Sequence, residues 1–225
     1  MWCIPKAQNA EFVAKMEDVL SVYERSYDPE YPVVCMDEKP YQLVGERFEP
    51  IKMSKNNHTE KYDYEYDRKG SCSIFMFNEP LSGWRSCMAL PQRTSEDWAE
   101  RVKWLLDEQY PDVKKVVLVM DNLNTHTTAS FYKIFEPKEA LRLSQRLEIH
   151  YTPKHGSWLN MAEIELSSLS AQCLGTRRIS SLDDLNRELK IWHTIRNASQ
   201  KGVVWQFTTY DARIKLKHLY PVVKF

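Results

Sequence analysis

The chain has 225 residues, of which 43% are hydrophobic and 28% charged, and its formal net charge at pH 7 is zero. This length allows one large domain or two small ones with a substantial core. No apolar run approaches the roughly 20 residues of a membrane span and no signal peptide opens the chain, so we expect no membrane partner. The five cysteines are odd in number and form no C-x-x-C pair, which predicts reduced thiols in a cytoplasm rather than a zinc site.

Charge is distributed unevenly along the chain. Residues 1–136 carry 17 Lys and Arg against 23 Asp and Glu, a balance of −6, whereas residues 137–225 carry 14 against 8, a balance of +6. An acidic half followed by a basic half fits a site that collects cations beside a surface that meets phosphates. Ordinary surface variation explains the same counts equally well.

Hydrophobic periodicity and turn residues predict a mixed α/β fold. The first half of the chain favours a helix, a short buried strand and an antiparallel hairpin, and the second half alternates helices with two further strands. This order is typical of a mixed sheet flanked by helices. In chain order, the expected elements are the helix Glu11–Tyr23, the strand Pro32–Met36, the hairpin strands Ser71–Phe77 and Gly83–Leu90, a helix from Thr94 or Ser95 to about Gln109, the strand Lys115–Met120, a broken helical region from Thr127 to Arg146, the strand Leu147–Tyr151, the helices Trp158–Leu174 and Ser181–Ala198, and the amphipathic tail Phe207–Tyr220.

Two of the predicted buried strands end at an aspartate. Asp37 follows the run PVVCM, and Asp121 follows KVVLVM. An aspartate in this position often only shapes a turn or caps a helix. In mixed sheets, however, ligands gather at the carboxyl ends of parallel strands, so the two carboxylates could meet at one edge. Strand alternation puts Asp37 and Glu38 on opposite sides, with Asp37 on the side of Cys35, and favours Asp37 as the site residue.

A third carboxylate, Glu163, lies in the helix that follows the last strand. It falls at the edge of the apolar stripe, whereas Glu165 falls on the opposite flank. With Ser157 as the expected N-cap, Glu163 is about one turn inside the helix, where the dipole favours a carboxylate. Asn160 extends the polar patch beside Glu163, although a solvated edge glutamate would fit the same pattern. The stripe consists of Leu159, Ala162, Leu166, Leu169 and Cys173.

Three converging carboxylates without Cys or His suit Mg²⁺ or Mn²⁺ rather than zinc. Carboxylates packed together repel one another and need cations to stay ionised. Two such ions about 3.5–4 Å apart clamp the attacking and leaving oxygens of a phosphoryl displacement. The pattern therefore predicts a site for two divalent ions.

Several segments together resemble the DDE transposases of the mariner superfamily, in their bacterial insertion-sequence branch. The three acidic blocks are CMDEKPYQL at 35–43, VMDNLNTH at 119–126 and HYTPKHGSWLNMAEIE at 150–165. The similarity extends over nearly the whole chain, through DYEYDRKG at 63–70, FMFNEPLSGWR at 75–85, RRISSLDDL at 177–185 and TTYDARIKLKHLYP at 208–221.

The resemblance implies an RNase H-like fold, a mixed five-stranded sheet flanked by helices, with Asp37, Asp121 and Glu163 as catalytic and metal-binding triad. It also implies an enzyme that nicks insertion-sequence ends with Mg²⁺-activated water and joins the freed 3′-hydroxyl to target DNA. The implied partners are double-stranded DNA, both inverted-repeat ends and target, and a second copy of the chain in a homodimer. The implied location is the bacterial cytoplasm, at the nucleoid.

We expect three parts: an N-terminal helix and linker (1–30), the catalytic domain (31–200) and a basic tail packed on the core (201–225). Family members carry an N-terminal helix-turn-helix region, for which the stretch before Asp37 is too short. A truncated product, a second reading frame or an excised domain would each explain this. One alternative is therefore a catalytically silent fragment that dimerises with, or inhibits, full-length transposase. Another is an RNase H-like nuclease that acts on branched or hybrid substrates.

Further residues are candidates for supporting roles. Asn122, His126 and Asn160 could hold the metal ligands in place, although a turn-shaping or backbone-bonded role would fit Asn122 and His126 equally well. Basic side chains could contact DNA phosphates, and each of them would also fit as a solvated surface charge. These candidates for DNA contact are Lys154, His155, Arg177, Arg178, Arg213, Lys215 and Lys217.

Overall fold

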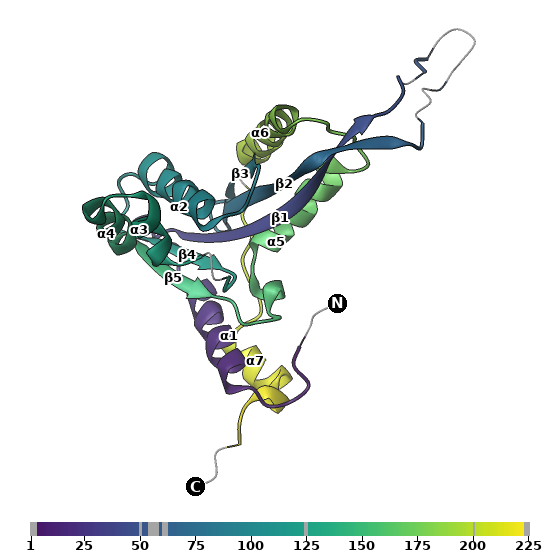
Figure 1. Cartoon of the computed structure of the whole chain (residues 1–225). Coiled ribbons are helices and arrows are strands. Elements are labelled where there is room, and N and C mark those ends of the chain that lie inside the picture. The colour runs from purple at the N-terminus through teal and green to yellow at the C-terminus, as the bar shows by residue number, and fades with distance from the viewer. Residues whose placement is uncertain are drawn as a thin grey trace.

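The computed structural model describes residues 4–49, 51–53, 59, 63–123, 126–199 and 201–222. Within these ranges the strands form one five-stranded mixed sheet in the order β3-β2-β1-β4-β5 (Figure 1). The strands are β1 (Val33–Glu46), β2 (Tyr66–Glu79), β3 (Trp84–Leu90), β4 (Val116–Met120) and β5 (Leu147–Tyr151). β2 pairs antiparallel with both β1 and β3, whereas β4 runs parallel to both β1 and β5.

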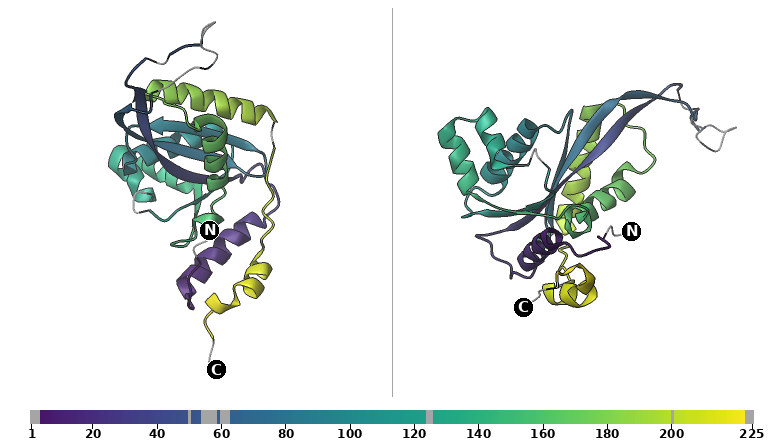
Figure 2. Two further views of the ribbon diagram at one scale, coloured as in Figure 1. Left: turned by 90° about the vertical axis from the view of Figure 1, so that its right-hand side faces the viewer. Right: turned by 60° about the horizontal axis from the view of Figure 1, so that its bottom comes forward.

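Helices cover both faces of the sheet. They are α1 (Ala10–Tyr23), α2 (Ser95–Trp104), α3 (Phe131–Ile134), α4 (Pro137–Gln145), α5 (Ala162–Leu169), α6 (Leu182–Ser199) and α7 (Thr209–Lys215). α2, α3 and α4 lie on one face and α5 and α6 on the other, while α1 and α7 lie side by side near the chain ends (Figures 1 and 2). In the part of the chain that the structure describes, no helix has both the length and the apolar character needed to cross a bilayer.

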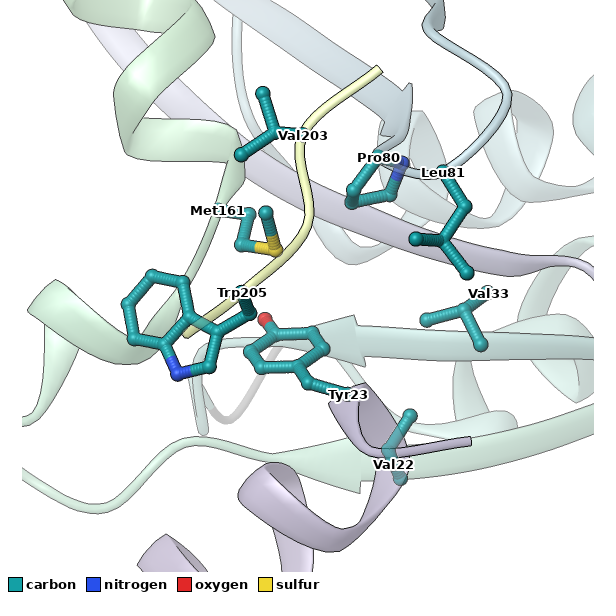
Figure 3. Close-up of a pocket in the computed structure, with 8 residues that line it drawn as sticks. All are labelled: Val22, Tyr23, Val33, Pro80, Leu81, Met161, Val203 and Trp205. Carbon is teal, nitrogen blue, oxygen red and sulfur yellow. The ribbon is translucent and has the colours of Figure 1, made fainter. Parts of the chain in front are cut away.

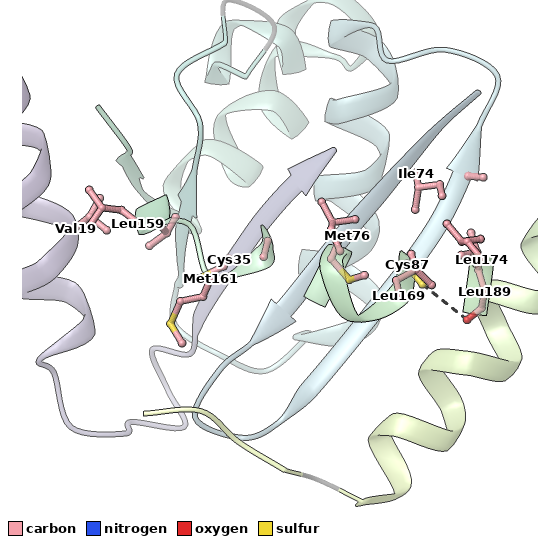
Figure 4. Packing of buried hydrophobic residues seen from close by; sticks show 14 of the residues in the cluster. Val19, Cys35, Ile74, Met76, Cys87, Leu159, Met161, Leu169, Leu174 and Leu189 are labelled. Carbon is pink, nitrogen blue, oxygen red and sulfur yellow. Dashed lines mark hydrogen bonds between the residues drawn. The ribbon is translucent and has the colours of Figure 1, made fainter. Parts of the chain in front are cut away.

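Side chains on the two faces of the sheet build two separate hydrophobic cores. Along β1, Cys35 packs into the core under α1 and α5, whereas Val34 and Met36 pack into the core under α2. Figure 4 shows part of the first core, with side chains contributed by β1, β2, α5 and α6 among other segments. This alternation is the one predicted from the sequence, and it places Asp37 and Glu38 on opposite faces of the strand.

Most of the predicted elements are present with shifted ends. The helix that begins at Ser95 is confirmed, and Thr94 caps it in a reciprocal capping box with Asp97. The largest difference is β1, which was predicted to end at Met36 and continues to Glu46. After Cys35 it pairs only with β2, and past Pro40, where the pairing of β2 with β3 ends, a two-stranded ribbon of β1 and β2 extends beyond the sheet (Figure 1). Only one face of this ribbon packs on the core, through Leu43 and Cys72, so the continuous apolar run of a strand buried on both faces is absent.

The helix predicted over Trp158–Leu174 is divided. Ser157 opens a 3₁₀ turn that ends at Leu159, and α5 starts only at Ala162, with Met161 as a cap residue that makes no side-chain bond. The prediction of Ser157 as N-cap of this helix is therefore wrong. The predicted apolar stripe is buried along its whole length.

Residues 201–208 connect α6 to α7 as a strap without helix or strand. A Cβ atom on Gly202 would lie 2.5 Å from the carbonyl oxygen of Leu81, so only glycine allows this approach. Further along, the strap lines a small apolar pocket of about 20 Å³, where Trp205 and Tyr23 have ring centroids 5.5 Å apart (Figure 3). The division of the chain at residues 30 and 200 stays a prediction.

Candidate active site

Asp37 and Asp121 lie just past the point where the parallel pairing of β1 with β4 ends, with Asp37 inside β1 and Asp121 directly after β4. Cys35 on β1 lies opposite Val119 on β4. Two residues further along each strand the chain reaches Asp37 and Asp121, so the register brings the two aspartates to the same edge of the sheet. This is the arrangement expected from the two apolar runs that precede them.

Asp37 has a pKa that is raised above the usual value of an aspartate. Its Oδ1 accepts a hydrogen bond from the backbone N–H of Glu38, 2.7 Å away. Burial nevertheless raises the pKa of Asp37 to about 7, and the negative charges of Asp121 and Glu163 act in the same direction. No cationic side chain is among the groups that shift it. The three predicted carboxylates therefore share one neighbourhood.

Glu163 is positioned by Asn160, which is 1% exposed. The Nδ2 of Asn160 donates to the carbonyl oxygen of Met36 (2.8 Å), and its Oδ1 accepts from the N–H of Ala162 (3.1 Å). Its own carbonyl accepts from the N–H of Glu163 at 3.1 Å. One buried amide thus joins the residue before Asp37 to the first turn of α5, and this bonding also accounts for the break before that helix.

Tyr23 supports the same junction from α1, a role that the sequence did not indicate. Its hydroxyl donates to the carbonyl oxygen of Leu159 (2.8 Å) and lies 3.4 Å from the Sγ of Cys35. Burial raises the pKa of Tyr23, so the hydroxyl stays protonated and can donate. A tyrosine at the end of an amphipathic helix reads as an ordinary packing residue, and no local pattern connects it to a turn 136 residues away.

His126 lies behind Asp121 and is 1% exposed. Its Nδ1 is 2.7 Å from Asp121 Oδ1, an ion-pair contact whose angle departs from that of a hydrogen bond. Its Nε2 lies 3.0 Å from the Oε1 of Glu38. Burial alone would lower the pKa of His126, but the carboxylates of Asp121 and Glu38 prevail and raise it to about 9. His126 is therefore charged at neutral pH.

The side chains of Asp37, Asp121 and Glu163 are too far apart in this structure to bind one metal ion together. Among the described residues, no group of three or more His, Cys, Asp or Glu side chains is arranged to hold a metal ion. The donor set is nevertheless one of hard oxygen atoms that repel one another, which is the chemistry of a Mg²⁺ or Mn²⁺ site. Binding one ion with all three side chains requires them to move closer together. Asn122, next to Asp121, is exposed.

Glu165, two residues after Glu163, has a different environment. Its Oε2 lies 2.8 Å from the Nε of Arg85, with both side chains at most 5% exposed. Its Oε1 lies 3.4 Å from an Nη atom of Arg196. Glu165 is thus neutralised by the protein's own cations and is not available to the edge where Asp37 lies.

Two of the basic candidates lie in the turn before α5. Lys154 and His155 are exposed, and His155 has a positive φ of 64°. Gly156 follows them and is buried, with a Cβ position only 2.5 Å from the ring of Pro153. The turn is therefore tightly built, and it presents both basic side chains to solvent.

Four of the other basic candidates pair with acidic side chains. Arg178 pairs with Glu46 and donates to the carbonyl oxygens of Asp63 and Glu65, so it braces the β1–β2 ribbon. Arg177 forms an exposed ion pair with Glu188. Arg213 pairs with Glu17, and Lys215 with Asp211, again at exposed positions, and Lys217 is exposed.

The mixed five-stranded sheet with helices on both faces defines an RNase H-like core, the fold that was predicted. The family model described as "DDE superfamily endonuclease" matches residues 32–186, and the chain belongs to this family. The match includes Asp37, Asp121 and Glu163 within its bounds.

Solved structures of similar fold are complexes of the Mos1 transposase. The Mos1 mariner paired end complex with Mn matches with a TM-score of 0.55 and 15% identity, over 86% of this chain and 58% of that one. The Mos1 strand transfer complex matches with a TM-score of 0.57 and 13% identity, over 89% and 61%. The paired end complex with Mg gives 0.57 and 13%, over 99% and 66%.

At these identities the similarity concerns the fold, and this chain spans 58% of the first of those proteins. The sequence matches no protein of curated function. The comparisons therefore establish the fold and the endonuclease family of this chain.

Proposed function

We propose that this chain is the catalytic domain of a DDE transposase from the bacterial insertion-sequence branch of the mariner superfamily. It cuts DNA strands at insertion-sequence ends and transfers the 3′-hydroxyl into target DNA. The observation that carries the proposal is the proximity of Asp121 and Glu163 to Asp37: burial raises the pKa of Asp37, and the charges of the other two carboxylates raise it further. Membership of the endonuclease family and the fold shared with Mos1 support it.

In this proposal Asp37, Asp121 and Glu163 hold two divalent ions, Mg²⁺ or Mn²⁺. When bound, such ions polarise the scissile phosphate and make a water molecule nucleophilic near neutral pH. The chain supplies the arrangement of the ligands. His126 occupies Oδ1 of Asp121, which leaves Oδ2 for an ion, and Asn160 holds the start of α5 against β1. Two of the Mos1 structures are described as paired end complexes with Mn and with Mg, which supports the choice of metal.

Contacts with DNA are proposed for the exposed basic side chains. Of these, Lys154 and His155 are closest in sequence to Glu163, in the turn that precedes the 3₁₀ turn Ser157–Leu159. Arg177, Arg213 and Lys215 can reach phosphates where a phosphate replaces the partly exposed carboxylate that pairs with each of them, at little cost in stability. Lys217 is exposed to solvent. Arg178 is the least suited, since its guanidinium is engaged by the ribbon.

The proposed partners are two inverted-repeat ends, target DNA and a second copy of the chain. The Mos1 structures are described as paired end and strand transfer complexes, which supports this choice of DNA partners. In the bacterial setting that we propose, the protein acts in the cytoplasm at the nucleoid.

Nicking of a supercoiled plasmid tests the proposed chemistry without knowledge of the end sequences. We expect nicking in Mn²⁺ that EDTA abolishes and that Asp121→Ala lacks. Asp112→Asn is the matched control, because Asp112 is an exposed aspartate before the other end of β4. Equal nicking by wild type and Asp121→Ala would refute the proposal, and preference for an RNA–DNA hybrid over duplex DNA would redirect it to an RNase H-like nuclease.

A further inference from the structure

Glu38 is the neighbour of Asp37, yet its carboxylate lies on the opposite side of β1. The Glu38 side chain is 4% exposed and reaches the face of the sheet that packs under α2. A carboxylate taken out of water is costly unless a charged or hydrogen-bonding partner compensates it. Its Oε1 has such a partner in His126, and its Oε2 has none among the described residues. Sequence analysis considered Glu38 only as an alternative to Asp37 and rejected it.

Contacts on several sides hold the His126 ring in place, so the ring can orient the side chain of Asp121. The ring stacks on Trp98, with centroids 6.0 Å apart and planes inclined by 26°. The hydroxyl of Tyr151 donates to the His126 carbonyl oxygen at 2.7 Å, which fixes the backbone. Both ring nitrogens face carboxylate oxygens, Nδ1 that of Asp121 and Nε2 that of Glu38. A ring in this position has only one orientation that satisfies both contacts.

We propose that Glu38 is a positioning residue that, through His126, fixes the carboxylate of Asp121 with Oδ1 toward the ring and Oδ2 toward the cation site. The contacts from Glu38 to His126 and from His126 to Asp121 connect one face of the sheet with the other. It rests on the proposed function, in which Asp121 is a metal ligand. Side chains that orient metal ligands typically account for 10–100-fold in metal affinity. Glu38 acts at one remove from the ligand, so we expect the lower end of that range.

The test is the affinity of the metal-free protein for Mn²⁺, measured by electron paramagnetic resonance of the free ion. Glu38→Met keeps the length of the side chain but removes its bond to Nε2, and we expect about tenfold weaker binding. Glu38→Gln retains an oxygen that can accept from Nε2 and should bind within about threefold of wild type. Glu79→Met is the matched control, because Glu79 is also a buried carboxylate with one partner, the Tyr110 hydroxyl at 2.8 Å. It should leave Mn²⁺ affinity unchanged.

A double-mutant cycle with His126→Phe shows whether Glu38 acts through the ring. In the His126→Phe background, Glu38→Met should weaken binding no further, because the link is already broken. Losses that multiply, or wild-type affinity in Glu38→Met, would overturn the proposal. If Glu38→Met does not fold, His126→Phe carries the test alone, with a tenfold loss expected and unchanged affinity contradicting it. A wild type that binds no Mn²⁺ would instead refute the proposed cation site itself.

Discussion

Two glutamates on α5, Glu163 and Glu165, lie in opposite electrostatic surroundings. Glu165 is buried and lies within 2.8 Å of Arg85 and 3.4 Å of Arg196. Glu163 is half-exposed, and its charge adds to the repulsion at Asp37. Residues two apart on a helix point to nearly opposite flanks, so one short helix serves an internal ion pair and an acidic site. Arg85 and Arg196 balance the charge of Glu165, whereas the carboxylates near Asp37 need a bound cation to balance theirs.

The largest expected effect is on DNA nicking by Glu163→Gln. Loss of a metal-binding carboxylate removes several kcal/mol of transition-state stabilisation, on the order of a thousandfold in rate. The free energy of unfolding in EDTA should stay within about 0.5 kcal/mol of wild type, because Glu163 makes no ion pair with any residue in the described ranges of the chain. Plasmid nicking and urea unfolding measure the two quantities. A variant that nicks normally would break the contrast between the two glutamates.

Glu165→Gln should show the converse, a loss of stability. Removing one partner of a buried ion pair leaves Arg85 uncompensated and costs about 3–5 kcal/mol. Urea unfolding of the metal-free protein measures this loss, with Glu188→Gln, a change in an exposed pair, as the control expected to alter little. A fully stable Glu165→Gln would show that the ion pair with Arg85 contributes nothing to the fold.

Because His126 contacts Asp121, it should make the free energy of unfolding depend on pH. Its pKa is raised from the usual 6.5 to about 9, so its contribution to stability is fully present below about pH 6.5 and is lost as pH rises through 9. The unfolding free energy in EDTA should therefore fall over this window, by up to roughly 3 kcal/mol. His126→Phe should flatten this part of the profile. A wild-type profile that is level from pH 6.5 to 9 would contradict the double ion pair.

The smallest of these effects belongs to Asn160→Ala. Leaving the buried carbonyl of Met36 unpaired costs about 1–3 kcal/mol. Asn186→Ala is a close match, since Asn186 bonds to both backbone groups of Ala89 at 2.8 and 3.0 Å. Both variants should lose stability, but only Asn160→Ala should also weaken Mn²⁺ binding. Equal Mn²⁺ affinity in the two variants would separate Asn160 from the site.

The sequence predicted the buried segments of the sheet because those features are local. Apolar runs of β-branched residues mark the buried strand segments that precede Asp37 and Asp121, and helical spacing identifies the stripe of α5. The start of α5 and the length of β1 were missed for a different reason. The first depends on a side-chain bond from Asn160 to Met36, and the second on pairing with a strand that begins at Tyr66.

Long-range partners limit what can be read at the site itself. Glu38 and His126 are 88 residues apart, and Arg178 reaches carbonyl groups 113 and 115 residues away. Nothing in the local sequence around Arg178 distinguishes an arginine that braces a ribbon from one that binds phosphate. Whether Asp37, Asp121 and Glu163 coordinate metal stays a prediction from sequence and proximity.

Anomalous diffraction from Mn²⁺-soaked crystals tests this prediction most directly. We expect a manganese peak bonded to at least one carboxylate oxygen of each of Asp37, Asp121 and Glu163, with the three side chains drawn together and Glu165 still on Arg85. Absence of a peak at this edge in crystals that hold Mn²⁺ elsewhere, or a peak bound by Glu165 in place of Glu163, would contradict the assignment.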